Sequence, residues 1–132
     1  MKKLFYASFA YMVIGQIAGV YYRELVRFTE FTGKSQLATV HTHAFSLGMM
    51  MLLVILALDK TFELSKSPGF NKWFVTYNAG LIGVLVTMTL RGTLQVYSSD
   101  IGGLNYVSGL MHAIFATGVV WFFLLLKKRL SL

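Results

Sequence analysis

Four long apolar stretches, separated by short segments that contain charged residues, dominate the hydrophobic pattern of this chain. A transmembrane helix needs about 20 apolar residues to cross a hydrocarbon core of about 30 Å. The stretches that meet or approach this length are residues 4–22, 37–58, 73–90 and 105–126. The pattern therefore predicts an all-α fold, with residues 1–132 forming a single transmembrane domain of four helices.

The composition agrees with a membrane protein. Apolar residues make up 56% of the chain and charged residues only 13%, whereas about a quarter of an average soluble domain is charged. The chain has no cysteine, which excludes disulfides, thiolate metal sites and cysteine nucleophiles. Its net charge of +7 comes from short basic clusters beside the apolar stretches. Such clusters are typical of membrane topology, so we expect the lipid bilayer and no nucleic acid as a partner.

The lysines and arginines also predict the orientation in the membrane. With the amino terminus inside, eight of them lie on the inner side and four on the outer side. Because basic residues accumulate on the cytoplasmic side, both termini are predicted to be cytoplasmic, in a multi-pass protein of the bacterial cytoplasmic membrane. The inner eight are Lys2, Lys3, Lys60, Lys66, Lys72, Lys127, Lys128 and Arg129; the outer four are Arg23, Arg27, Lys34 and Arg91.

All three histidines lie inside predicted membrane helices, where an ionisable side chain is by default a functional candidate. His43 lies roughly 9 Å and His112 roughly 10 to 11 Å below the outer helix ends, so the three imidazoles share one layer. Positions i and i+2 differ by about 200° around a helix, so His41 and His43 are predicted to point to opposite flanks. Arg91 is predicted to end the third helix just above this layer.

Other polar and small residues refine this picture. The acidic residues Glu24, Asp59 and Glu63 are predicted to lie in solvated loops, and no pair of carboxylates occurs inside a span, which disfavours proton pumps and cation transporters. Small residues let helices approach closely, so we expect further helices to pack on them in a homo-oligomer. These small residues are Gly15, Gly19, Gly80, Gly83, Gly109 and Gly118.

Residues 41–48, His-Thr-His-Ala-Phe-Ser-Leu-Gly, resemble the haem-bearing helices of the catalytic subunit of haem-copper oxidases. One of those helices carries a His-x-His followed a few residues later by glycine. The resemblance extends to architecture, because that subunit has twelve spans in three arcs of four around a pseudo-threefold axis. Its haem ligands lie mainly on the second helix of an arc, in the outer half of the membrane.

This resemblance implies a homotrimer of four-helix chains that mimics the twelve-helix oxidase core and binds haem b. His43 matches the low-spin haem ligand, His41 matches the neighbouring haem ligand, and Arg91 matches the arginines that hold propionates. The copper ligands and the cross-linked tyrosine of the oxidases have no counterpart here. Oxygen reduction is therefore not implied, and no complete catalytic site of an oxidase is visible.

The whole chain also resembles a family of small four-span bacterial membrane proteins of unknown function. The resemblance rests on the tyrosine-rich first span, the His-Thr-His motif, the Arg-Gly pair that follows the third span, and the histidine of the fourth span. That family implies no particular activity.

Three functional hypotheses follow. In the first, His43 of one subunit and His41 of the next bind haem b, for electron transfer or for redox or gas sensing. In the second, His41, His43 and His112 contribute to a zinc or copper site, or to a small-solute pathway, at a symmetric interface. In the third, the protein is a cofactor-free membrane assembly protein whose histidines only tie helices together.

Overall fold

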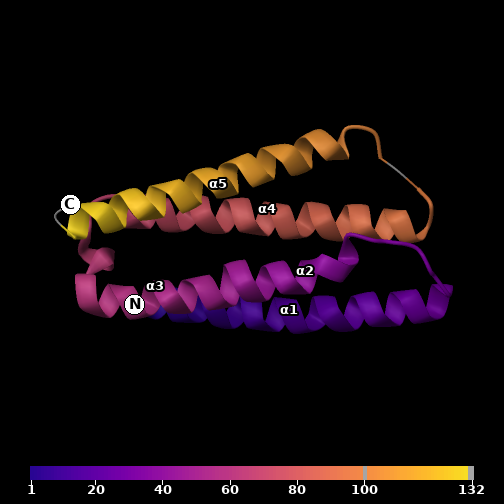
Figure 1. Ribbon diagram of the computed structural model, residues 1–132, viewed down its shortest axis with the longest axis horizontal. Helices are drawn as coiled ribbons and strands as arrows, with labels where there is room; N and C mark the ends of the chain where they lie inside the picture. The colour runs from indigo at the N-terminus through magenta and orange to yellow at the C-terminus, as the bar shows by residue number, and fades with distance from the viewer. Residues whose placement is uncertain (100, 131–132) are drawn as a thin grey trace.

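The structure is a computed structural model that describes residues 1–99 and 101–130, and its regular elements in that part are all helical (Figure 1). The first helix, α1, spans Lys2–Thr29. The second transmembrane helix has three consecutive parts, which are α2 (Leu37–His43), the π-helical segment η1 (Ala44–Met50) and α3 (Met51–Phe62). After the short 3-10 helix η2 (Leu64–Lys66) come α4 (Phe70–Val96) and α5 (Leu104–Arg129).

Four helices in the described part of the chain are long and apolar enough to cross a membrane. The prediction of an all-helical protein with four such helices is therefore confirmed, and each predicted span lies within one of them. Hydrophobic length alone places the spans because a bilayer tolerates backbone only when its polar groups are paired internally.

Two helices continue well beyond their apolar stretches. Helix α1 extends to Thr29, so Glu24 lies in a helix, where Arg27 pairs with it at 3.8 Å. The prediction of a loop at Glu24 is therefore wrong. Helix α4 extends to Val96, so the prediction that Arg91 ends this helix is also wrong. In both cases the sequence offers no glycine or proline that would stop the helix where the hydrophobicity ends.

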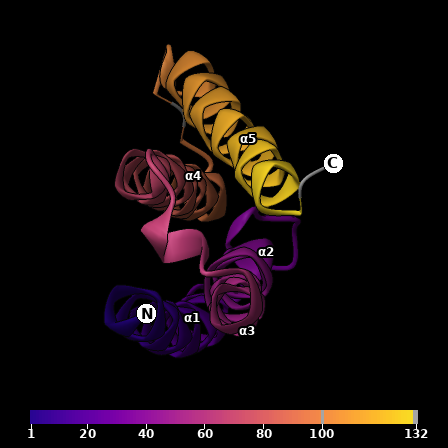
Figure 2. The same cartoon turned by 90° about the vertical axis from the view of Figure 1, so that its left-hand side faces the viewer.

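The helices are arranged so that α4 contacts both α5 and α2, while α1 packs on α2, η1 and α3. Seen along the bundle, α1, α2 and α4 occupy the corners of a triangle, with α5 outside it against α4 (Figure 2). Helices α1 and α4 run in the same direction, because Tyr11 bonds Asn78 and, further along both helices, Tyr21 bonds Thr93. Figure 1 shows that α5 lies farther from α4 at its amino-terminal end than at its carboxyl-terminal end.

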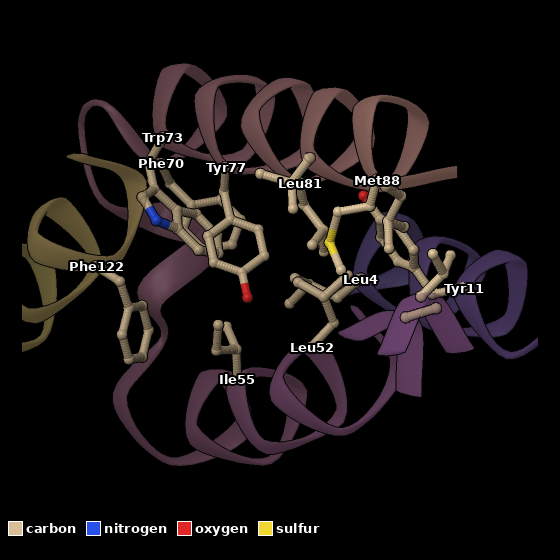
Figure 3. Close-up of a cluster of buried hydrophobic side chains, with 14 of the residues drawn as sticks. Leu4, Tyr11, Leu52, Ile55, Phe70, Trp73, Tyr77, Leu81, Met88 and Phe122 are labelled. Atoms are coloured by element: carbon tan, nitrogen blue, oxygen red, sulfur yellow. The ribbon is translucent and has the colours of Figure 1, made fainter. Parts of the chain in front are cut away.

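The largest buried side chains gather in the inner half of the bundle (Figure 3). The ring of Trp73 lies 5.5 Å from that of Tyr77 and 5.6 Å from that of Phe122. Its indole N–H donates to the carbonyl of Gly118 at 2.9 Å. Since Trp73 is fully buried with its polar atom paired, this aromatic cluster joins α4 to α5 without leaving an unsatisfied group.

Glycines allow α4 and α5 to approach each other closely. A Cβ added to Gly80 would lie 2.5 Å from the backbone nitrogen of Phe115, and one added to Gly118 would lie 3.0 Å from the Cα atom of Tyr77. These are backbone contacts that a larger side chain would prevent. The two glycines therefore serve contacts inside the chain.

The glycine pair of α1 is also occupied within the chain. Phe45 covers Gly15, and the Cβ atom of His41 lies 3.8 Å from the position of a Cβ on Gly19. Gly109 on α5 is the one predicted contact glycine with open space around it in the described part of the structure. The expectation that all six glycines offer surfaces to other copies is therefore wrong.

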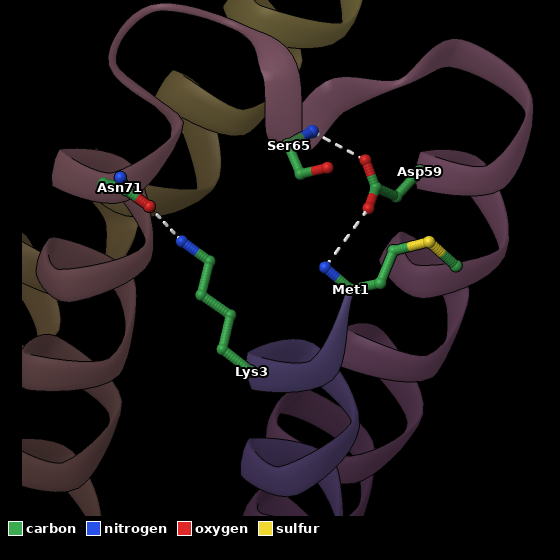
Figure 4. A network of polar contacts seen from close by, with 5 residues as sticks. All are labelled: Met1, Lys3, Asp59, Ser65 and Asn71. Atoms are coloured by element: carbon green, nitrogen blue, oxygen red, sulfur yellow. Dashed lines mark hydrogen bonds and ion pairs between the residues drawn. The ribbon is translucent and has the colours of Figure 1, made fainter.

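The inner end of the bundle is closed by polar contacts between segments (Figure 4). Asp59 is 3% exposed; its carboxylate accepts from the backbone N–H of Ser65 at 2.6 Å and lies 3.7 Å from the amino group of Met1. Arg129, at the end of α5, donates from Nε to the hydroxyl of Ser67 at 2.6 Å. The prediction that Asp59 lies in a solvated loop is wrong, since this residue ends a buried turn of α3.

Candidate functional site

His41 is directed toward α1. Its Cβ lies against Gly19, its ring packs edge-on against Phe45 at a centroid distance of 6.3 Å, and its Nδ1 atom is buried with no hydrogen-bond partner among the described residues. An unpaired buried nitrogen costs free energy. His41 thus fills the small-residue surface of α1, about 200° around the helix from His43.

His43 and His112 share a different arrangement. The Nδ1 atom of His43 lies 3.0 Å from the carbonyl oxygen of Thr39, and that of His112 lies 2.7 Å from the carbonyl oxygen of Ser108. A carbonyl oxygen can only accept, so each Nδ1 must carry the proton in these bonds. In a neutral imidazole, Nε2 then keeps a free lone pair and is the atom able to bind a metal.

A polar notch of about 190 Å³ lies at the outer end of the bundle. Its lining consists of Arg91, Gln95, Ser99 and Asn105. The notch joins the end of α4 to the first turn of α5, and the side-chain oxygen of Gln95 accepts from the backbone N–H of Gln36, at the start of α2, at 2.9 Å. The notch therefore lies where α2, α4 and α5 meet. A guanidinium and the positive end of the α5 dipole make it suited to an anionic group.

Helical spacing relates the two free imidazoles to this notch. His112 follows Asn105 by seven residues, and His43 follows Gln36 by seven. Seven residues are 20° short of two full turns, so each histidine lies on the same helix face as its notch residue, about 10.5 Å farther into the bundle. Both imidazoles thus lie at one level below the notch, one on α2 and one on α5.

The segment that follows His43 is π-helical, a form that occurs mostly as short bulges and often at functional sites. The hydroxyl of Tyr77 on α4 donates to the carbonyl of Leu47 inside this segment at 2.6 Å. Gly48 of the same segment packs against the ring of Tyr11, whose hydroxyl donates to Asn78 at 2.9 Å. Neighbouring helices thus support the irregular backbone, which keeps it stable in lipid.

Within the part of the chain that the structure describes, no group of three or more His, Asp or Glu side chains could hold a metal ion together. The structure brings Arg91 into the polar notch and His43 and His112 to one level below it, while His41 faces α1. The ion pairs between described residues are at the inner end or on α1, outside this region.

The comparison with known protein families matches nearly the whole chain, residues 1–129. The chain belongs to the family described as "Protein of unknown function (DUF2871)". This membership confirms the resemblance to a family of unknown function, and the resemblance to haem-copper oxidases stays a prediction. No curated protein and no solved structure matches the chain.

Sequence reasoning missed three of the four residues of the notch and the π-helical segment. Gln95, Ser99 and Asn105 looked like ordinary residues of an outer loop. The spacing of seven between Asn105 and His112 was readable, but it gains meaning only when Arg91 is known to face the start of α5. The carbonyl that Tyr77 satisfies has no signal in the sequence.

Proposed function

We propose that this protein is a membrane haem b-binding protein that acts in electron transfer or in redox or gas sensing. His43 and His112 supply the axial ligands, and Arg91 pairs with the propionates at the outer end. The observation that carries the proposal is the shared geometry of the two imidazoles, each with Nδ1 tied to a backbone carbonyl and Nε2 free. This is the arrangement by which proteins orient histidine ligands.

The donor set fits haem better than it fits an isolated metal ion. Haem iron takes four ligands from its own macrocycle, so the protein needs to supply only one or two. A structural zinc site needs four protein ligands in tetrahedral geometry. The described residues bring no third His, Asp or Glu to either imidazole.

The notch supplies what the propionates of haem require. Arg91 lines it together with side-chain amides and a hydroxyl, and hydrogen bonds from a guanidinium to a carboxylate are roughly twice as strong as neutral ones. The notch lies about two helical turns above the imidazoles. A planar group with a metal at its centre and carboxylates at one edge would use both parts of the site.

Bound haem would supply one-electron chemistry or, with one axial position open, binding of a diatomic gas. The residues of the chain have simpler tasks. His43 and His112 are held in one tautomer by their carbonyl partners, and Arg91 offsets the negative charge of the carboxylates. The apolar surroundings keep bulk water away from the ligands, which raises the strength of these charge interactions.

A trimer with twelve spans, as the oxidase resemblance implies, is the proposed assembly. Gly109 supports helix contacts between copies, because it is the open small residue on α5. A ligand pair made of His43 and the neighbouring copy's His41 is less favoured. His41 already packs against Gly19 of its own chain, and it would have to leave that position to reach a second subunit.

The test is the absorption spectrum of protein purified in mild detergent and supplemented with haem. We expect a Soret band with bis-histidine character in the wild type, and its loss or shift in both His43→Ala and His112→Ala. His41→Leu is the matched control and should keep the band. Arg91→Gln should keep the position of the band but weaken haem binding by about tenfold, through the lost charged hydrogen bond. No band in the wild type, or one indifferent to both alanine variants, would refute the proposal.

Zinc or copper is the second candidate, because the same free Nε2 atoms would bind these ions. With only two histidine ligands per chain, it requires symmetric copies to complete the coordination. Elemental analysis of the purified protein separates the two candidates, since stoichiometric zinc or copper without a Soret band favours the ion. Protein free of both cofactors, with lower oligomer stability in the histidine variants, would leave the assembly function.

A further inference from the structure

A second hollow lies on a different face of α4 from Arg91. It has a volume of about 470 Å³ and lies between α1 and α4, with the start of α2 as its floor. Its walls include Ile14 and Ile17 of α1 and Leu85 and Val86 of α4, and its floor is Leu37 and Val40. The triangular arrangement of α1, α2 and α4 in Figure 2 explains why a groove forms here.

Hydrogen bonds between α1 and α4 bound this groove at both ends. Tyr11 donates to Asn78 at 2.9 Å on the inner side, and Tyr21 lies 3.0 Å from Thr93 on the outer side. The ten residues from Tyr11 to Tyr21 span about 15 Å along α1. One leaflet of a bilayer has a hydrocarbon depth of about 15 Å. The groove therefore runs along the membrane normal for the depth of a single leaflet, in the outer half.

The shape of the groove decides between a helix and a chain as its occupant. A volume of 470 Å³ over about 15 Å leaves a cross-section of roughly 30 Å². A helix 10–12 Å across needs roughly 80–110 Å². A transmembrane helix of a second copy does not fit, whereas an extended hydrocarbon chain does.

The polar atoms at the groove have their hydrogen bonds satisfied. The hydroxyl of Thr89 donates to the carbonyl of Leu85 at 2.8 Å, and that of Thr93 donates to the carbonyl of Thr89 at 2.8 Å. Tyr21 must then donate to Thr93, because the Thr93 proton is already used. No donor at this rim is left for the carbonyl oxygens of a quinone ring, which favours a chain without a polar ring.

We propose that this groove holds one acyl chain of a phospholipid from the outer leaflet as a fixed part of the folded protein. Phospholipid chains are the bulk component that reaches this depth, and the groove opens laterally to them. The bound chain fills the space between α1 and α4, which otherwise meet mainly through the two tyrosine bonds. This proposal is independent of the haem proposal, since Arg91 lies on another face of α4.

The experiment uses the full chain, reconstituted in vesicles of palmitoyl-oleoyl phosphatidylglycerol, extracted in mild detergent, washed, and weighed by native mass spectrometry. We expect the wild type to retain one phospholipid per chain. Ala18→Phe fills the groove from α1, and Val86→Trp fills it from the half-exposed wall of α4. Each should lower retention by roughly tenfold, because displacing even two methylenes from an apolar site has that effect.

Ala57→Phe is the control, since Ala57 is exposed on α3 and does not line the groove. It should retain the lipid as the wild type does. Equal retention in all four proteins, or none in the wild type, would overturn the proposal. So would a copurified isoprenoid quinone that both groove variants lose, or a protein dimer that they dissociate. Val86→Trp keeps the test valid if Ala18→Phe fails to fold, because the side chain of Val86 is half exposed.

Discussion

The inner and outer halves of the bundle differ in how completely their groups are satisfied. In the inner half, Trp73 and Tyr77 are fully buried and hydrogen-bonded, and Asp59 is held by a backbone N–H and an amino group. In the outer half, buried side-chain atoms of Gln36 and His41 have no partner among the described residues. The first half is built for stability, whereas the second keeps polar groups at a cost.

That cost suggests where function lies. Proteins tolerate unsatisfied buried groups mainly at sites that a ligand or a partner completes. The polar notch, the two free imidazoles and the acyl-chain groove all belong to the outer half. The contrast yields predictions that either half can contradict.

The largest expected effect is in the inner half. Trp73→Ala should lower the free energy of unfolding by about 3–5 kcal/mol, because it removes a fully buried aromatic side chain from the cluster. Reversible unfolding in mixed micelles, followed by circular dichroism, measures this loss. Phe123→Ala is the control, since Phe123 is 60% exposed and faces detergent or lipid; a similar loss there would mean that the inner cluster is not special.

The next effect compares two glycines. Gly80→Ala should cost about 1–3 kcal/mol, because the added Cβ would clash with the backbone of Phe115. Gly109→Ala, with open space around it, should stabilise α5 by up to about 1 kcal/mol in isolated chains. Unfolding of both variants under the same conditions tests the pair. A cost at Gly109 that appears only at high protein concentration would instead reveal a contact between copies.

A smaller effect is expected at the boundary between the halves. Tyr77→Phe removes the donor to the Leu47 carbonyl in η1 and should cost about 1 kcal/mol. Hydrogen exchange of residues 44–50 should rise at the same time. Tyr106→Phe, at an 85% exposed position, should change neither quantity. Unchanged exchange in the Tyr77 variant would show that η1 does not need this support.

The smallest effect is expected at His41. His41→Leu removes a buried nitrogen without a partner and should change the free energy of unfolding by less than about 1 kcal/mol, in either direction. The same variant should leave the oligomeric mass in detergent unchanged. A strong loss of stability or of oligomer would show that the imidazole of His41 has a partner in another copy.

The bilayer made the four helices predictable, because it requires about 20 apolar residues in each span. It gave no information about helix ends outside the hydrocarbon, so Thr29 and Val96 were missed as end points. Asp59 was misplaced for a related reason. Nothing local distinguishes a carboxylate that ends a buried turn from one in a solvated loop.

The site was only partly predictable. Helical rise and rotation placed the imidazoles in one layer and directed His41 and His43 to different flanks, in line with the packing of His41 on α1. Which side of α4 carries Arg91, and that Asn105 lies beside it, depends on how α5 packs through Gly80 and Gly118. That packing is tertiary information. The glycines were recognised, but their partners could not be named from the sequence.

The π-helical segment η1 has a consequence for how this chain can change over time. Its i to i+5 hydrogen bonds accommodate one residue more than an α-helical turn, so deleting a single residue among 44–50 would rotate α3 by about 100° against α2. Leu52 and Ile55 would then leave the core while His43 kept its direction. The segment acts as a phase adjuster, which lets the aim of the imidazoles and the packing of the inner helix diverge independently.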